Sequence, residues 1–267
     1  MKKMLKIVKI ICWILAVTGT GLLLGFIETE QYDRTIKRVF INIDYGGADV
    51  MVTVANIDSI VRRSNGELRG KSLVSVNTGK IVDAILREPF VELVNVYENN
   101  EGYLFIDVWQ RKPVLRIINQ KFESFYIDGS GKLLPVKPGY PAHVLVANGF
   151  IPDSFLKNRF RRITLPPPSY PVVPDSVMTG LLRLALFLSN DPYFKTAIDQ
   201  VFVNGQHEFE LIPKKGDQVV FLGDACNLEE KFGKLQIFYD QGLNQIGWNK
   251  YHFINIKYTN QVVCSKL

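Results

Sequence analysis

The chain has 267 residues, of which 47% are apolar and 22% charged, and this composition excludes a disordered protein. Its formal net charge is +6, and four lysines at the amino-terminal tip (Lys2, Lys3, Lys6 and Lys9) supply most of that excess. The rest of the chain is nearly balanced in charge, so the basic character does not indicate nucleic-acid binding.

An uncharged stretch, Ile10 to Ile27, follows the basic tip of residues 1–9 and precedes the acidic Glu28. A helix of this length, with Lys9 snorkelling at its end, can cross a hydrocarbon core of about 30 Å. Positive charge before the span and negative charge after it predict a cytoplasmic amino terminus. We therefore expect a single-pass membrane protein whose bulk lies outside the cytoplasm, facing the periplasm or the cell exterior. A cleaved secretory signal is the alternative, but the run is long for one and no A-x-A-like site follows it.

The predicted transmembrane helix, residues 10–27, contains two glycines four residues apart, Gly21 and Gly25. Small residues at this spacing let a second helix approach closely. We expect any helix–helix contact in the membrane to use these two positions.

Residues 36–112 alternate short apolar runs with turn and capping residues, which predicts a small α+β unit. Two helices are expected on one face of a three-stranded sheet. The predicted strands are Val39 to Tyr45, Val91 to Glu98 and Tyr103 to Arg111; the predicted helices run from an Asn56 cap to Arg63 and from an Asn77 or Thr78 cap to Pro89.

Residues 113–267 predict a larger mixed β domain with packing helices. Asp128-Gly-Ser-Gly131 is expected to form a hairpin turn, because it lacks the later carboxylates of a calcium loop. The predicted strands are Val114 to Ile118, the hairpin Phe125 to Leu134, Gln200 to Val203, Glu208 to Ile212, Gln218 to Leu222 and Phe253 to Val263; helices are expected after the caps Asp175 or Ser176 and Asn227.

Motifs for catalysis or metal binding are weak. Ser154 and Lys157 form an S-x-x-K pair like that of penicillin-interacting serine enzymes, but the companion S-D-N and K-T-G elements are missing. The three histidines stand far apart, so no metal site is expected. We predict a protein that is not an enzyme and has no cofactor and no small-molecule substrate.

Two further features leave alternatives open. Cys226 and Cys264 either pair or, as we favour, remain inert thiols, because two cysteines do not make a disulfide framework. The basic cluster Arg159, Arg161 and Arg162 is either a solvated turn or a docking site for an acidic partner or lipid headgroups.

The chain resembles the FtsQ/DivIB group of bacterial cell-division proteins, in a Bacteroidetes-like form. The order of tip, span, small α+β unit and larger β domain matches throughout. Three local signatures carry the resemblance: Ile106 to Ile117 with its charged pair and proline, the hairpin Phe125 to Leu134, and a tail containing Lys231 to Tyr239, Gly247-Trp248 and Ile254 to Cys264. The tip is shorter than the cytoplasmic tail usual in that group.

The resemblance implies a POTRA-like domain at residues 36–112 and a non-enzymatic scaffold of the division machinery, or divisome, at the septum. Its implied partners are FtsB/DivIC-like and FtsL-like bitopic proteins. A terminal strand at a sheet edge would accept a partner strand through main-chain hydrogen bonds. The implied partner-binding residues are Ile254, Asn255, Ile256, Lys257, Tyr258, Thr259 and Asn260.

Two other functions remain as alternatives. One is a POTRA-bearing envelope assembly factor or chaperone, which would need repeated units or a membrane barrel that the sequence does not indicate. The other is an anchored serine enzyme of the cell wall that uses Ser154 and Lys157.

Overall fold

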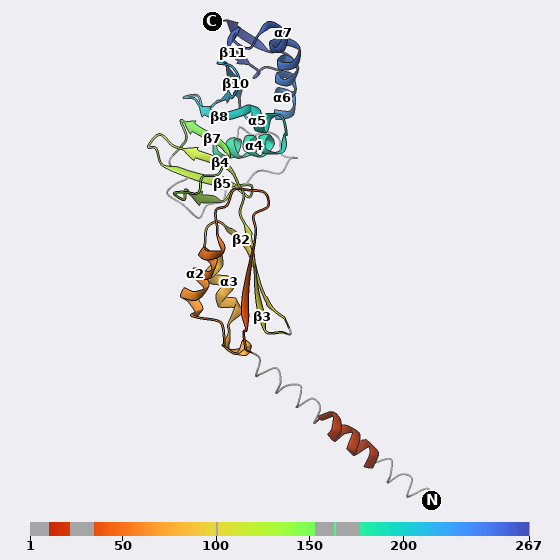
Figure 1. Cartoon of the computed structure of the whole chain (residues 1–267). Helices are drawn as coiled ribbons and strands as arrows, with labels where there is room; N and C mark the ends of the chain where they lie inside the picture. Colours follow the sequence, from red (N-terminus) through yellow and green to blue (C-terminus); the bar gives the residue numbers. More distant parts are fainter. Residues whose placement is uncertain (1–10, 22–34, 100, 153–162, 164–176, 267) are drawn as a thin grey trace, which may run out of the picture. The chain divides into compact units, whose positions relative to one another are not determined.

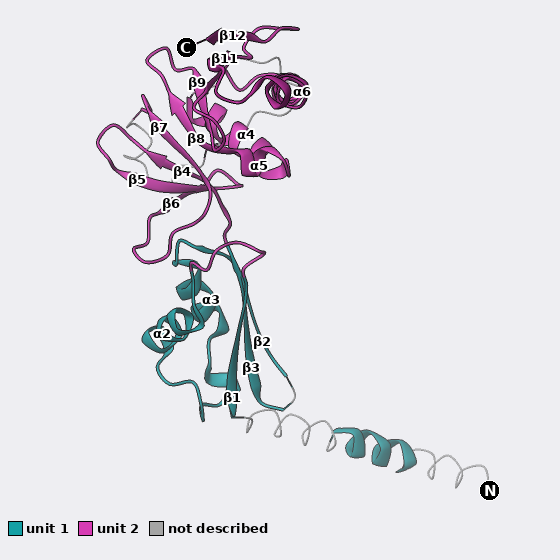
Figure 2. Cartoon of the chain, turned by 45° about the horizontal axis from the view of Figure 1, so that its top comes forward, with its two compact units in different colours: residues 1–44, 52–110 teal, residues 45–51, 111–267 magenta. Residues whose placement is uncertain are grey.

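The computed structural model describes residues 11–21, 35–99, 101–152, 163 and 177–266 (Figure 1). The chain divides into two compact units, coloured separately in Figure 2. Unit 1 comprises residues 1–44 and 52–110, and unit 2 comprises residues 45–51 and 111–267.

A helix covers residues 11–21, inside the predicted transmembrane stretch, whose other positions lie outside the described residues. Within the described ranges, no helix is both long enough and apolar enough to cross a membrane. Gly21 ends the described helix, and a Cβ added there would meet nothing within 4 Å. Gly25 lies outside the described residues, so the helix–helix contact stays a prediction.

Unit 1 contains a three-stranded sheet with two helices on one face (Figure 2). The central strand β3 pairs in parallel with β1 and antiparallel with β2. The elements are β1 (Arg38–Asp44), α2 (Val54–Asn65), a short 3-10 turn (Leu73–Ser75), α3 (Thr78–Leu86), β2 (Val91–Glu98) and β3 (Tyr103–Gln110). Apolar residues at helical spacing, such as Ile81 and Ile85 of α3, are buried, and so are the alternate residues Leu104, Ile106 and Val108 of β3.

The first helix of unit 1 begins earlier than the sequence predicts. The N-cap is Thr53, whose hydroxyl accepts from the Asn56 backbone N–H, while the Asn56 side chain accepts from the Thr53 backbone N–H. This reciprocal capping box satisfies two orphan donors at once. Asn56, the predicted cap, is therefore the third residue of the helix. The predicted cap Asn77 is confirmed for α3, because its side chain accepts from Lys80 N.

Unit 2 contains a nine-stranded mixed sheet in the order β12-β11-β10-β9-β8-β7-β4-β5-β6. Its strands are β4 (Pro113–Ile118), β5 (Ser124–Asp128), β6 (Leu133–Pro135), β7 (Leu145–Gly149), β8 (Ile198–Val203), β9 (Phe209–Pro213), β10 (Val219–Gly223), β11 (Tyr251–Asn255) and β12 (Val263–Lys266). Its helices are α4 (Val177–Asn190), α5 (Phe194–Ala197), α6 (Leu228–Ile237), a π-helical turn (Phe238–Leu243) and α7 (Asn244–Ile246).

One core serves the whole of unit 2. Helices α4 and α6 contribute buried residues such as Leu181 and Phe232, which join the inward residues of the strands in a single cluster. Both helices lie on the same side of the sheet (Figure 1). The predicted α+β class and large sheet with packing helices are thus confirmed.

Two parts of the sheet differ from the prediction. Strand β7 was not predicted, yet it joins the two halves of the sheet by pairing in parallel with both β4 and β8. The predicted single strand from Phe253 to Val263 is wrong, because β11 ends at Asn255 and β12 starts at Val263. Asn255 accepts from Lys257 N at 3.0 Å, and Asn260 has a left-handed φ of 56°, so these residues form a turn.

Candidate functional site

The last strand of the sheet is the candidate interaction site. Strand β11 is hydrogen-bonded on both flanks, in parallel with β10 and antiparallel with β12. Strand β12 stands at the end of the strand order and pairs only with β11 among the described strands. The open edge predicted for Ile254 to Val263 therefore lies at β12 (Val263–Lys266) instead.

The register shows which main-chain groups of β12 face the open side. Ile256, just after β11, donates its backbone N–H to Phe221 O of β10 at 3.0 Å. The even-numbered residues of β11 therefore point their main-chain N–H and C=O groups toward β10. The odd-numbered Phe253 and Asn255 then point toward β12, opposite Ser265 and Val263. The N–H and C=O of Cys264, between these two, consequently face away from β11.

The seven predicted binding residues fall into three groups. Ile254 and Ile256 are 0% exposed and belong to the core of unit 2, so a partner cannot touch their side chains. Asn255 is half-buried at the end of β11 and holds the turn through its side chain. The exposed members, all in the turn between β11 and β12, are Lys257, Tyr258, Thr259 and Asn260.

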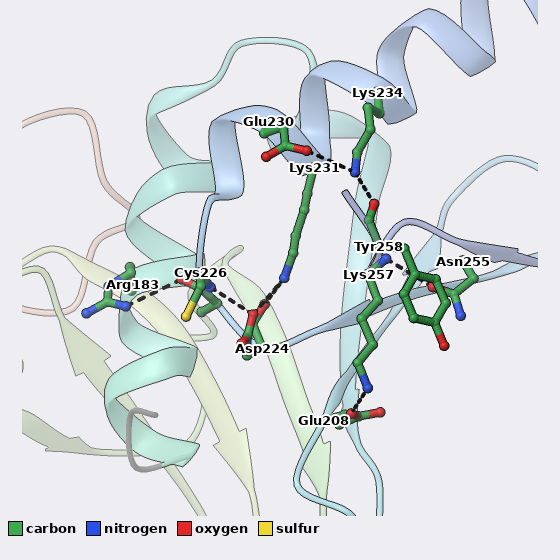
Figure 3. A network of polar contacts seen from close by, with 11 residues as sticks. Arg183, Glu208, Asp224, Cys226, Glu230, Lys231, Lys234, Asn255, Lys257 and Tyr258 are labelled. Carbon is green, nitrogen blue, oxygen red and sulfur yellow. Dashed lines mark hydrogen bonds and ion pairs between the residues drawn. The ribbon is translucent and has the colours of Figure 1, made fainter. Parts of the chain in front are cut away.

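Two lysines hold this turn, one from α6 and one from the turn itself (Figure 3). Lys234 of α6 donates to the Tyr258 carbonyl and lies 3.3 Å from a Glu230 carboxylate oxygen. Lys257 pairs with Glu208, next to β9. That hydrogen bond is the main cause of the raised pKa of Lys257. The turn that precedes the open strand is thus held to two other elements of the same unit.

A second polar cluster lies beside the first, where β10 leads into α6 (Figure 3). The Lys231 side chain is only 7% exposed, and its Nζ donates to Asp224 Oδ1 at 2.7 Å and to Asp224 O at 2.9 Å. Burial acts to raise the pKa of Asp224, but the hydrogen bond and charge of Lys231 outweigh it and lower that pKa. The cluster fixes the start of α6, and therefore the helix that carries Lys234.

The two cysteines of unit 2 are both free. Burial raises the pKa of Cys226, assisted by the Asp224 charge, and burial also raises the pKa of Cys264. A raised thiol pKa reduces the thiolate fraction at neutral pH, so both side chains have the character of inert thiols. The sequence favoured two unpaired thiols over a disulfide, and both cysteines are free in the structure.

Sequence reasoning missed Lys231, Lys234 and Glu208 as parts of this site. The only available signal was the position of the two lysines in the tail signature, since their partners come from other elements. Ser154, Lys157 and the cluster Arg159, Arg161 and Arg162 lie outside the described residues. Within the described ranges, no group of three or more His, Cys, Asp or Glu residues could hold a metal ion.

Comparison with known families agrees with the two units. A family model described as FtsQ/DivIB, C-terminal related, matches residues 112–265, more than half of the chain. A POTRA-like domain model matches residues 34–109. Among curated proteins, no relative matches the chain. FtsQ/DivIB proteins have a role in cell division and are generally not enzymes. The chain therefore belongs to the FtsQ/DivIB-related family.

Proposed function

We propose that this protein is a non-enzymatic scaffold of the divisome that captures small coiled-coil membrane partners at its last sheet edge. The family match supports a place in cell division. The observation that carries the scaffold function is the position of β12, which ends the nine-stranded sheet and leaves the main-chain groups of Cys264 unused by β11.

An extended segment of the partner would add to β12 as a further strand. Main-chain hydrogen bonds would provide much of the affinity, and side chains on alternate positions would select the partner. Val263 of β12 is 48% exposed and Tyr258 is 50% exposed, so both offer apolar surface next to the edge. By family, FtsB/DivIC-like and FtsL-like bitopic proteins are the proposed partners.

The proposed location is the cytoplasmic membrane at the septum, with the amino terminus inside and both units in the periplasm. The uncharged stretch of residues 10–27 and its flanking charges support this orientation. External protease should degrade residues 36–267 in spheroplasts without lysis, and full protection of these residues would contradict the topology.

A proline at position 264 tests the edge directly. Cys264→Pro removes the N–H that faces the open side, and an edge strand tolerates proline there. We expect loss of co-purification with the FtsB/DivIC-like partner and loss of recruitment of that partner to midcell. Cys264→Ala keeps the donor and is the matched control for the lost thiol. Capture that survives in a Cys264→Pro variant with unchanged thermal unfolding would exclude strand addition at β12.

A further inference from the structure

The sheet of unit 1 has a second face that no described element of that unit covers. Helices α2 and α3 pack on the opposite face (Figure 2). Because side chains alternate across a strand and the strands are in register, the outward residues line up in rows. Arg38 and Tyr103 begin this face, and three full rows follow them: Phe40–Phe105–Tyr97, Asn42–Asp107–Asn95 and Asp44–Trp109–Leu93.

The first row is a stack of aromatic rings. The centroids of Phe40 and Phe105 are 5.2 Å apart with an interplanar angle of 15°, and those of Tyr97 and Phe105 are 5.2 Å apart at 11°. The ring faces therefore cover one another, and ring edges are what the row presents outward. A sugar ring needs a free aromatic face for stacking, so this row does not suit a glycan.

The second row places one carboxylate between two apolar rows. Asn42 Nδ2 donates to Asp107 Oδ1 at 2.8 Å. Desolvation raises the pKa of Tyr97, and the hydrogen bond of its hydroxyl to Asp107 raises it further. These neutral donors orient the carboxylate without neutralising it. In the third row, Leu93 is 55% exposed beside Trp109.

The position of this charge restricts what can cover the face. A second copy packed face to face in the same register would bury each Asp107 against the aromatic or polar row of its twin, at a large desolvation cost. Arg38, the cation on this face, lies over the Phe40 ring, 5.8 Å from its centroid, and would have to leave that ring to pair with the twin's Asp107. An anionic lipid surface would meet Asp107 and also Asp44 at the end of the face. An occupant that brings its own cation between two apolar groups complements all three rows.

We propose that the uncovered face of the unit 1 sheet docks an amphipathic helix of another protein, with a Lys or Arg between two large apolar residues. Three strands span roughly 10 Å, which one helix of about 10–12 Å diameter covers. Successive rows are about 6.7 Å apart, and helix residues i, i+4 and i+8 rise by about 6 and 12 Å. The basic residue at i+4 then reaches Asp107, and the residues at i and i+8 meet Phe105 and Trp109. This surface is independent of β12.

Synthetic peptides test this inference on the purified full chain. One fluorescent alanine-based helix carries Leu, Lys and Leu at positions i, i+4 and i+8, and its twin carries Glu in place of Lys. We expect at least tenfold tighter binding of the Lys peptide by fluorescence anisotropy. Asp107→Asn, which keeps the shape of the side chain, should abolish this preference. Asp83→Asn, which changes an exposed carboxylate on α3, should leave it unchanged.

Other outcomes would overturn the inference. These are equal affinity for the two peptides, absence of binding by either peptide, or a Lys preference that persists in Asp107→Asn. Concentration-dependent self-association that Leu93→Ser abolishes would show that a second copy occupies the face instead, and would equally exclude the proposed helix. Thermal unfolding of each variant separates a lost surface from a lost fold.

Discussion

Asp128 combines two structural tasks at the turn between β5 and β6. Its Oδ2 accepts from Arg111 at 2.9 Å, and both side chains are almost fully buried. Its Oδ1 accepts from the backbone N–H groups of Ser130 and Lys132, each at 2.9 Å. The predicted hairpin turn is therefore confirmed, and the aspartate that resembles a calcium ligand is a turn-forming residue.

We expect Asp128→Ala to reduce the free energy of unfolding by about 3–5 kcal/mol, because it leaves the Arg111 charge buried without its partner. The matched control is Asp199→Ala, which removes an exposed carboxylate 3.7 Å from Lys214. That loss should be below about 1 kcal/mol. Urea unfolding of the purified chain measures both. Losses of similar size would contradict the importance of burial in the first pair.

At the scale of elements, the turn between β11 and β12 is held in part by a contact with α6. Lys234→Met keeps the aliphatic stem on α6 but removes the donor to the Tyr258 carbonyl. Because a charged hydrogen bond contributes about 1.5 kcal/mol or more, we expect about tenfold faster amide exchange in residues 257–262. Lys250→Met, at an exposed lysine before β11, is the control. Unchanged exchange in Lys234→Met would show that other contacts hold the turn.

The elements with strong local signals were predictable. Helix α3 has a cap and an apolar stripe at helical spacing, and β2 and β3 alternate clearly around a glycine turn. The sequence therefore predicts where these elements begin, and it predicts where they end to within three residues. Strand β7 is short, and its Leu-Val-Ala-Asn-Gly sequence lacks alternation. Its place is determined by its neighbours β4 and β8, which no local pattern reveals.

The region of the candidate site was predictable from the sequence, but its open strand was not, because long-range strand pairing determines which strand ends the sheet. The tail signature indicated the correct region, and polar residues from Lys257 to Gln261 are a turn signal that apolar residues on both sides concealed. Which strand ends the sheet is a property of long-range pairing. The contacts of Lys234 and Lys257 likewise join residues 24 and 49 positions apart, beyond any sequence pattern.

At the scale of the whole molecule, we propose one surface for another chain in each unit. In unit 2 this surface is the edge strand β12, and in unit 1 it is the uncovered sheet face around Asp107. An edge uses main-chain hydrogen bonds, whereas a face uses side chains, so the two surfaces select different kinds of segment. Two such surfaces would let the protein bind different partners at once.

The most direct measurement of the central claim is amide hydrogen exchange at Cys264, with and without the FtsB/DivIC-like partner. Strand addition predicts strong slowing at Cys264 in the complex. Val263 and Ser265 should change little, because their main-chain groups already face β11. A stable complex in which the Cys264 amide exchanges as fast as in the free protein would contradict the claim.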